Sequence, residues 1–230
     1  MIFILKETEV LEELGIKNYK IIQSQTVFKF GTDSVLLSNF VKVKKGEKVA
    51  DLGTGTGIIP ILLIAKNENC EIYGIELNPI SFDMAYRTIK LNNLQEKIKI
   101  INADLRKLDG ILSKNEFDIV VCNPPYKQEN TGLINKNENI KSARHEATCT
   151  LEDVIICAKS LLKFGGRFYL IHKPERLSDI ICLMRKHKIE AKKLCFVHSD
   201  IKKEPSLILI EGKSGGKSGI RIQAPITINN

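Results

Sequence analysis

The sequence predicts an α/β fold built on one mostly parallel sheet of seven strands, and three observations support this. From Lys48 onward, short runs rich in β-branched residues alternate with stretches of helical periodicity, which is the pattern of βα units. A glycine-rich turn joins the first of these strands to its helix. The last two strands have no helix between them, so we expect a C-terminal hairpin with one antiparallel strand.

The elements follow one another along the chain. The expected strands are segments 48–51, 71–76, 98–102, 117–122, 167–172, 192–198 and 206–210. The apolar run 58–65 predicts the first crossover helix. Apolar residues at helical spacing predict two more helices, one from Leu151 that we expect Gly165 to stop, and one over 177–184.

We expect residues 1–45 to form an N-terminal extension that closes over a cofactor, and residues 46–230 to form one catalytic domain. The extension has two strand-like segments, 19–22 and 27–30, and a helix from about Thr32. At 230 residues with 43% apolar composition, the chain can bury a full core. The long polar loop 127–148 is functional or mobile.

Composition indicates a cytoplasmic protein with an anionic partner. Lys and Arg total 35 against 27 Asp and Glu, a net charge of +8, which suits nucleic acid but also a lysine-rich solvated surface. The six cysteines show no C-x-x-C spacing, so we expect reduced, mostly buried thiols. The apolar start of the chain is too short for a signal peptide or a membrane span. We expect no metal site, no membrane contact and no obligate protein partner.

Residues 49–57 read V-A-D-L-G-T-G-T-G and lie between a predicted strand and a predicted helix. Gly53, Gly55 and Gly57 permit a tight turn and a close approach of a ligand to the backbone. Asp51 ends the strand, where a nucleotide phosphate usually needs no acid. A carboxylate at this point suits a cationic amino group instead.

Two further acids follow at the ends of the next strands. Glu76 is placed to accept hydrogen bonds from two ribose hydroxyls. Asp104 either accepts from an adenine amine or caps the local backbone. NAD and S-adenosylmethionine share the ribose, but three acids on consecutive strand ends suit a zwitterionic cofactor better than a pyrophosphate. We therefore expect S-adenosylmethionine rather than NAD.

The four residues after segment 117–122 are Asn123, Pro124, Pro125 and Tyr126, at the edge where α/β enzymes place their chemistry. The Asn side chain offers a donor and an acceptor, the prolines leave their carbonyls free, and the Tyr ring can stack on a flat base. Such a pocket would hold an exocyclic NH2 group and aim its nitrogen at an electrophile. An ordinary proline turn has the same letters, so this interpretation depends on the upstream motifs.

The segment 212–218 reads G-K-S-G-G-K-S and is similar to a phosphate-binding P-loop. It has three residues where that motif needs four, and no helix follows it. We therefore expect a flexible basic loop, whose lysines, with Arg221, either touch phosphates or belong to a disordered tail.

Together these motifs resemble the S-adenosylmethionine-dependent N6-adenine methyltransferases, which implies a Rossmann-like class I methyltransferase fold. The segments F-K-F-G-T-D-S-V-L-L at 28–37, A-R-H-E at 143–146 and G-G-R-F-Y-L-I-H-K-P-E-R-L at 165–177 are similar to the bacterial tRNA1(Val) adenine-37 N6-methyltransferases. The resemblance covers nearly the whole chain and implies methylation of adenine 37 in the anticodon loop of a valine tRNA.

Other activities share some of these motifs. N-P-P-Y is shared with DNA adenine and protein glutamine methyltransferases, so both remain alternatives. The first 45 residues are short for the helical substrate-binding domain of the glutamine enzymes, and no target-recognition domain for DNA is evident. An NAD dehydrogenase leaves N-P-P-Y unexplained. A non-catalytic RNA-binding module would not need the three acids and Asn123 together.

The resemblance also implies a role for each site residue. The cofactor-binding set is Asp33, Asp51, Gly53, Thr54, Gly55, Gly57, Glu76, Asp104, Leu105 and Asn123. For catalysis, Asn123 and the Pro124 carbonyl hold the target amine, and Tyr126 stacks on the flipped base. The substrate-binding set is Pro125, Lys127, Arg144 and His145, and for His145 a structural role stands beside a catalytic one.

Overall fold

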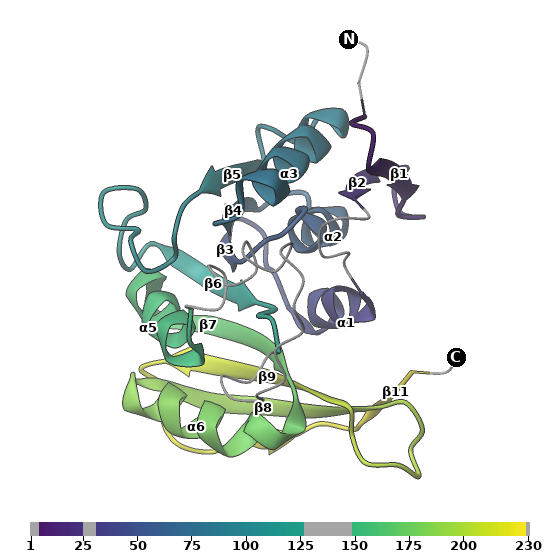
Figure 1. Cartoon of the computed structure of the whole chain (residues 1–230). Coiled ribbons are helices and arrows are strands. Elements are labelled where there is room, and N and C mark those ends of the chain that lie inside the picture. The colour runs from purple at the N-terminus through teal and green to yellow at the C-terminus, as the bar shows by residue number, and fades with distance from the viewer. Residues whose placement is uncertain (1–4, 25–30, 127–148, 229–230) are drawn as a thin grey trace, which may run out of the picture.

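The main sheet of the computed structural model has nine strands in the order β10-β8-β9-β7-β6-β3-β4-β5, with β11 also paired to β8 (Figure 1). The structure describes residues 5–24, 31–126 and 149–228. The seven predicted strands are β3 (Lys48–Leu52), β4 (Glu71–Glu76), β5 (Ile98–Asn102), β6 (Phe117–Cys122), β7 (Leu162–His172), β8 (Ile189–His198) and β9 (Leu207–Ser214). Among these seven, β9 alone runs in the opposite direction to the other six, so its pairings with β7 and β8 are antiparallel. The predicted sheet and its C-terminal hairpin are therefore confirmed.

Helices cover both faces of this sheet, and each face has its own apolar layer. The helices are α1 (Thr32–Phe40), α2 (Ile58–Lys66), α3 (Pro79–Leu91), α5 (Leu151–Leu161) and α6 (Leu177–Lys186), with a 3-10 turn η2 (Pro174–Arg176). The first layer joins the sheet to α1, α2 and α3, and the second joins it to α5 and α6. Nothing in these described helices is long and apolar enough to cross a membrane.

Local sequence explains where the helices begin. The Asn78 side chain accepts hydrogen bonds from two backbone N–H groups of α3, and Pro79 occupies the first helical position. Thr150 and Asp153 form a reciprocal capping box at the start of α5.

All six cysteines are free and four of them are buried, which confirms the expectation of mostly buried thiols.

The predicted end of α5 was wrong. The helix stops at Leu161, because Leu162 already pairs with Phe117 as the first residue of β7. Gly165 has a φ of +81° and lies inside an irregularity of β7 rather than at a helix cap. Leu162 joins the strand rather than the helix because it pairs with a residue 45 positions earlier in the chain. The local helical pattern contains no information about this pairing.

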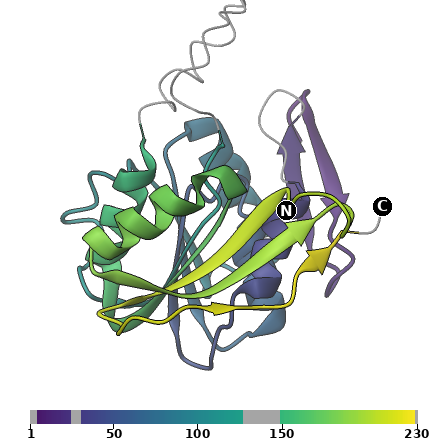
Figure 2. The ribbon, with the colours of Figure 1, turned by 90° about the horizontal axis from the view of Figure 1, so that it is seen from below.

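The predicted flexible loop at 212–218 was also wrong in part. Residues 212–214 belong to β9, which is longer than expected. Beyond them, β10 (Arg221–Ile222) and β11 (Ile226–Thr227) pair parallel with β8 and so cover its outer edge. Figure 2 shows this C-terminal segment running along the side of the sheet.

The N-terminal extension contributes a separate hairpin and a helix. Strands β1 (Glu9–Glu13) and β2 (Lys20–Ser24) pair antiparallel and pack beside α3. The Ile22 N–H donates to Thr88 Oγ1 at 3.1 Å, and the Asn92 amide bonds both backbone groups of Lys20. The expected strand 27–30 lies outside the described residues. The extension is thus anchored at its hairpin, while closure over a cofactor stays a prediction.

Candidate active site

Parallel pairing brings the carboxyl ends of β3, β4, β5 and β6 to one edge of the sheet. Leu52 pairs with Ile75 on one side and with Cys122 on the other. The residues that follow these three positions therefore start at the same level. The loops at this edge carry the glycine turn, Glu76, Asp104 and Asn123.

The glycine turn forms an open cradle over this edge. Gly53, Gly55 and Gly57 have φ angles of +72°, +58° and +87°, which favour glycine. A Cβ added at Gly53 or Gly55 would meet no atom of the described residues within 4 Å, so these two positions are open on that side. A Cβ at Gly57 would lie 3.5 Å from the Ala85 Cβ, which shows how closely the turn packs on α3.

Asp51 lies beneath this cradle, at the end of β3, and is fully buried. Within the described part of the chain, neither of its carboxylate oxygens has a hydrogen-bond partner, and the same holds for the Thr54 hydroxyl. Burial, with a smaller contribution from the charge of Glu76, raises the pKa of Asp51 from 3.8 to about 7, while the nearby Thr54 hydroxyl acts in the opposite sense. A cationic group with N–H donors would relieve this buried carboxylate. The amino group of S-adenosylmethionine fits that requirement.

Glu76 is held in place by two backbone donors. Its Oε2 accepts from the Gly55 N–H at 2.7 Å, and its Oε1 accepts from the Asn78 N–H at 2.8 Å. These two bonds fix the carboxylate beside the glycine turn, and a carboxylate oxygen can accept more than one hydrogen bond. The predicted ribose contact is compatible with this arrangement and stays a prediction.

Asp104 accepts hydrogen bonds from Arg106, a residue that was not predicted to belong to the site. Arg106 Nε lies 3.0 Å from Asp104 Oδ1, and Arg106 Nη2 lies 2.6 Å from Oδ2. These hydrogen bonds hold the pKa of Asp104 below its usual value. The predicted adenine contact of Asp104 and its neighbour Leu105 stays a prediction, in which an adenine amine shares the carboxylate with Arg106. The signal available in the sequence was the i, i+2 spacing in D-L-R.

Asn123 is tied to helix α1 of the N-terminal extension. Its Nδ2 donates to the Ser34 Oγ at 3.1 Å, across 89 residues of sequence. The Tyr126 hydroxyl lies 3.0 Å from Asn123 Oδ1 and 2.8 Å from Asp33 Oδ2, so either oxygen can take its proton. Ser34 was not predicted, although it stands next to the predicted Asp33. Ser34 of α1 therefore orients the Asn123 amide directly, and Asp33 of the same helix contacts it through Tyr126.

Tyr126 packs against the end of β7. Its ring centroid lies 5.4 Å from that of His172 in an edge arrangement, and the Lys173 ammonium lies 5.5 Å from the Tyr126 centroid. Burial raises the pKa of the Tyr126 phenol, so the group is neutral and can donate. Burial, with the charge of Arg176, lowers the pKa of His172, whose Nδ1 accepts from the Lys173 N–H at 2.8 Å. Stacking of Tyr126 on a base stays a prediction.

The model of the methyltransferase small domain family matches residues 13–187 of the chain. The chain belongs to this methyltransferase family. Its fold, predicted as a Rossmann-like class I methyltransferase, is thereby confirmed.

Relatives of this methyltransferase carry a narrower name. A protein from Porphyromonas gingivalis, named tRNA1(Val) (adenine(37)-N6)-methyltransferase, is 30% identical over 207 residues, which cover 86% of this chain and 79% of the relative. One of the same name from Histophilus somni is 31% identical over 161 residues, covering 70% and 67%.

Solved structures support the fold of this methyltransferase. A predicted O-methyltransferase from Agrobacterium tumefaciens matches with a TM-score of 0.69 and 22% identity, covering 85% of this chain and 86% of that one. TYW2 from M. jannaschii, solved in complex with AdoMet, matches with a TM-score of 0.61 and 16% identity, covering 93% and 89%.

The methyltransferase site thus gathers most of the predicted residues at one edge. The glycine turn, Asp51, Glu76 and Asp104 follow neighbouring strands, and Pro124 and the exposed Pro125 continue from Asn123. Lys127, Arg144 and His145, predicted to bind substrate, lie outside the described residues. Three further residues, Ser34, Arg106 and His172, were not predicted from the sequence and contact the predicted residues.

Proposed function

We propose that this methyltransferase transfers the methyl group of S-adenosylmethionine to the N6 atom of an adenine in tRNA. The substrate we infer is adenine 37, in the anticodon loop of a valine tRNA, and such a substrate implies a place in the cytoplasm. The relatives that carry this activity in their names resemble the chain over most of its length. The observation that carries the proposal is the oriented Asn123 amide at the sheet edge that also holds buried Asp51.

The geometry of the cradle supports the proposed cofactor residues. Asp51 and the turn from Gly53 to Gly57 hold the methionine part, because a buried carboxylate without partners among the described residues suits an ammonium group. Glu76, fixed beside the glycine turn by two backbone donors, holds the ribose, and Asp104 and Leu105 hold the adenine. When bound, S-adenosylmethionine supplies a methyl group on a positively charged sulfur, which is an electrophile.

Asn123 and Pro124 orient the target amine. The adenine N6 lone pair is delocalised into the ring, so the amine is a poor nucleophile. The Asn123 Oδ1 and the Pro124 carbonyl accept its two N–H groups, which favours a pyramidal nitrogen and stabilises the positive charge that grows during attack. Ser34 contributes indirectly, since its bond to Nδ2 leaves Oδ1 as the atom that faces the target.

Tyr126 need not compete with the target for Asn123. Its hydroxyl has a second acceptor, Asp33 Oδ2, at 2.8 Å. When the Tyr126 hydroxyl donates its hydrogen bond to Asp33, both lone pairs of Asn123 Oδ1 are available to the target amine. Asp33 therefore acts as a positioning residue for the pocket.

The reaction requires no strong general base. The methylated ammonium product is acidic and loses a proton readily to water. His172 is buried with a lowered pKa and its Nδ1 is occupied by a backbone donor, which suits a packing role beside Tyr126. The target adenine must leave its stack, which costs a few kcal/mol in a duplex and less in a loop.

The experiment incubates the purified protein with labelled S-adenosylmethionine and, in parallel, unmodified tRNA, duplex DNA and a release-factor protein. The expected result is N6-methyladenosine in tRNA, identified by mass spectrometry after nuclease digestion. Label found solely in DNA or in protein would keep the pocket chemistry but overturn the substrate. Absence of label from all three acceptors would overturn the proposed cofactor.

A further inference from the structure

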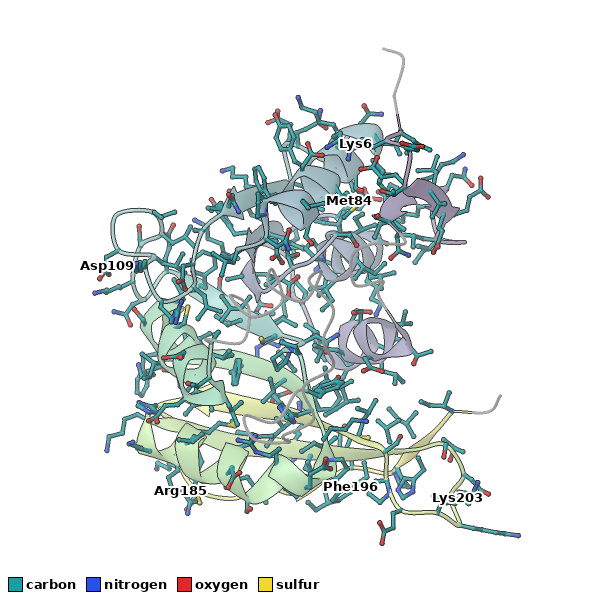
Figure 3. The ribbon with its side chains drawn as sticks, in the orientation of Figure 1. Lys6, Met84, Asp109, Arg185, Phe196 and Lys203 are labelled. Atoms are coloured by element: carbon teal, nitrogen blue, oxygen red, sulfur yellow. The ribbon has the colours of Figure 1, made fainter. Side chains whose placement is uncertain are left out.

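Basic side chains gather around β8 and the strands beside it. Segments 185–194 and 211–222 contain eight Lys or Arg residues against two Glu, a net charge of +6 within a chain of net charge +8. The pairing of β8 with β9 and β10 brings these two segments together. Figure 3 shows this side of the molecule, with Arg185 near one end and Phe196 and Lys203 toward the other.

Five of these eight cations lack an acidic partner. Arg185 pairs with Glu190, Lys193 with Glu211, and Lys186 with Glu152, each within 2.8 Å. In the part of the chain that the structure describes, no ion pair involves the other five, which are Lys188, Lys192, Lys213, Lys217 and Arg221. We call these five the β8 cluster. The Lys192 ammonium donates to backbone carbonyls, and the charges of the other four are left to solvent or to a ligand.

The fold fixes the β8 cluster in place rather than leaving it on a loose tail. Lys192 lies at an irregularity of the β8–β9 pairing, and its ammonium donates to the Lys217 carbonyl at 3.0 Å and the Gly219 carbonyl at 2.7 Å. The Gly215 N–H donates to the Lys188 carbonyl at 2.9 Å. The basic segment expected to be flexible is thus hydrogen-bonded to Lys188, just before β8, and to Lys192 within β8, and its like charges are held near one another despite their repulsion.

The sheet register gives the distance from this cluster to the active site. Cys122, Leu170, Ile210, Leu194 and Ile222 lie in one row across β6, β7, β9, β8 and β10. Asn123 and Arg221 are each one residue from this row. Four strand spacings of about 4.8 Å separate them, so Arg221 lies about 19 Å from Asn123. Lys188 lies just before β8 and Lys192 near its start, and Lys213 and Lys217 lie at and beyond the end of β9, so these four members lie toward the opposite end of the sheet from Asn123.

A distance of about 19 Å is too long for the flipped nucleotide itself. A nucleic-acid duplex rises by about 3.4 Å per base pair, so this distance corresponds to about six base pairs. A stem that adjoins the modified loop therefore presents its phosphates at this range. Lysine ammonium groups suit such contacts, because they bind phosphates as point charges without reading bases.

We propose that the β8 cluster binds the phosphate backbone of the double-stranded stem next to the methylated adenine. This inference rests on the proposed function, since it assigns a second contact surface to the same tRNA. It implies that recognition depends on the folded arm of the RNA, and that the contacts are independent of its sequence.

The test measures tRNA binding as a function of salt for two variants matched in charge. The cluster variant is Lys213→Gln, Lys217→Gln and Arg221→Gln, which changes exposed side chains and spares Lys192. The control variant is Lys44→Gln, Lys45→Gln and Lys90→Gln, which removes three exposed charges elsewhere. The slope of log K against log salt should fall by about 2 to 3 in the cluster variant and stay at the wild-type value in the control.

The same preparations distinguish the two proposals. If both variants keep the wild-type salt slope, the β8 cluster does not bind RNA, whether or not tRNA is methylated. Wild-type binding that depends on the cluster, without methylation of tRNA, would support the docking surface and overturn the proposed reaction. An equal loss of slope in both variants would show a nonspecific charge effect and would also overturn the inference.

Discussion

The substitution Asp51→Asn should make the cofactor-free protein more stable at pH 8 while abolishing its cofactor binding. Asp51 is fully buried, and neither carboxylate oxygen has a partner among the described residues. Its folded-state pKa of about 7 lies above the ordinary value of 3.8, so the folded protein holds the proton more tightly than the unfolded chain does. Asparagine keeps the size of the side chain and removes the charge.

The magnitude follows from linkage between protonation and folding. Below pH 4 the carboxyl is protonated in both states and costs nothing, and stability then falls as the pH rises to about 7. The pKa of Asp51 differs by about three between the folded and unfolded states, and a pKa difference of one corresponds to about 1.36 kcal/mol. Above pH 7 the buried carboxylate therefore lowers the free energy of unfolding by about 4 kcal/mol. For a domain of this size, about 4 kcal/mol corresponds to a rise of roughly 8 to 16 °C in the melting temperature of the variant.

The assay is thermal or urea unfolding of both proteins without cofactor at pH 5 and pH 8. At pH 5 the carboxyl is protonated in the folded protein and mostly ionised in the unfolded chain, so the two proteins should differ by about 1.6 kcal/mol, well below the difference at pH 8. Equal stability at pH 8, or the same difference at both pH values, would refute a buried carboxylate of raised pKa. Titration calorimetry with S-adenosylmethionine then measures cofactor binding. The variant should not bind the cofactor, since it lacks the carboxylate that we assign to the amino group of S-adenosylmethionine.

Three further changes test the rest of the site. Asn123→Ala should lower turnover by roughly 10² or more with cofactor affinity nearly unchanged, as when a transition-state contact is lost, and near-normal turnover would discard the pocket. Ser34→Ala should lower turnover by about tenfold through a freely rotating Asn123 amide, whereas Ser38→Ala on the same helix, whose hydroxyl bonds the Val35 carbonyl, should leave turnover unchanged. Gly57→Ala should destabilise the protein by about 1 kcal/mol or more in urea unfolding, because its φ of +87° strains any side chain; unchanged stability would contradict a rigid left-handed turn.

Much of the sheet was predictable because its signals are local. The bounds of β4, β5 and β6 agree with the expected segments, since a short β-branched run between turn residues is read over a handful of positions. The glycine turn was equally clear, because positive φ angles at Gly53, Gly55 and Gly57 are a property of the residue type. Predicted bounds were wrong where a pairing between distant residues overrode the local pattern. Leu162, for example, pairs with Phe117 instead of extending α5.

The sequence by itself determined which side chains are capable of the chemistry and placed them at strand ends. The tertiary structure decided how those side chains are held: Ser34 reaches Asn123 across 89 residues, and the C-terminal strands pair with β8 to gather a basic surface. Turn geometry and periodicity are short-range and can be read in one pass along the chain. Hydrogen bonds and strand pairings between remote segments depend on which surfaces meet, and that is settled when the sheet and its two apolar layers assemble.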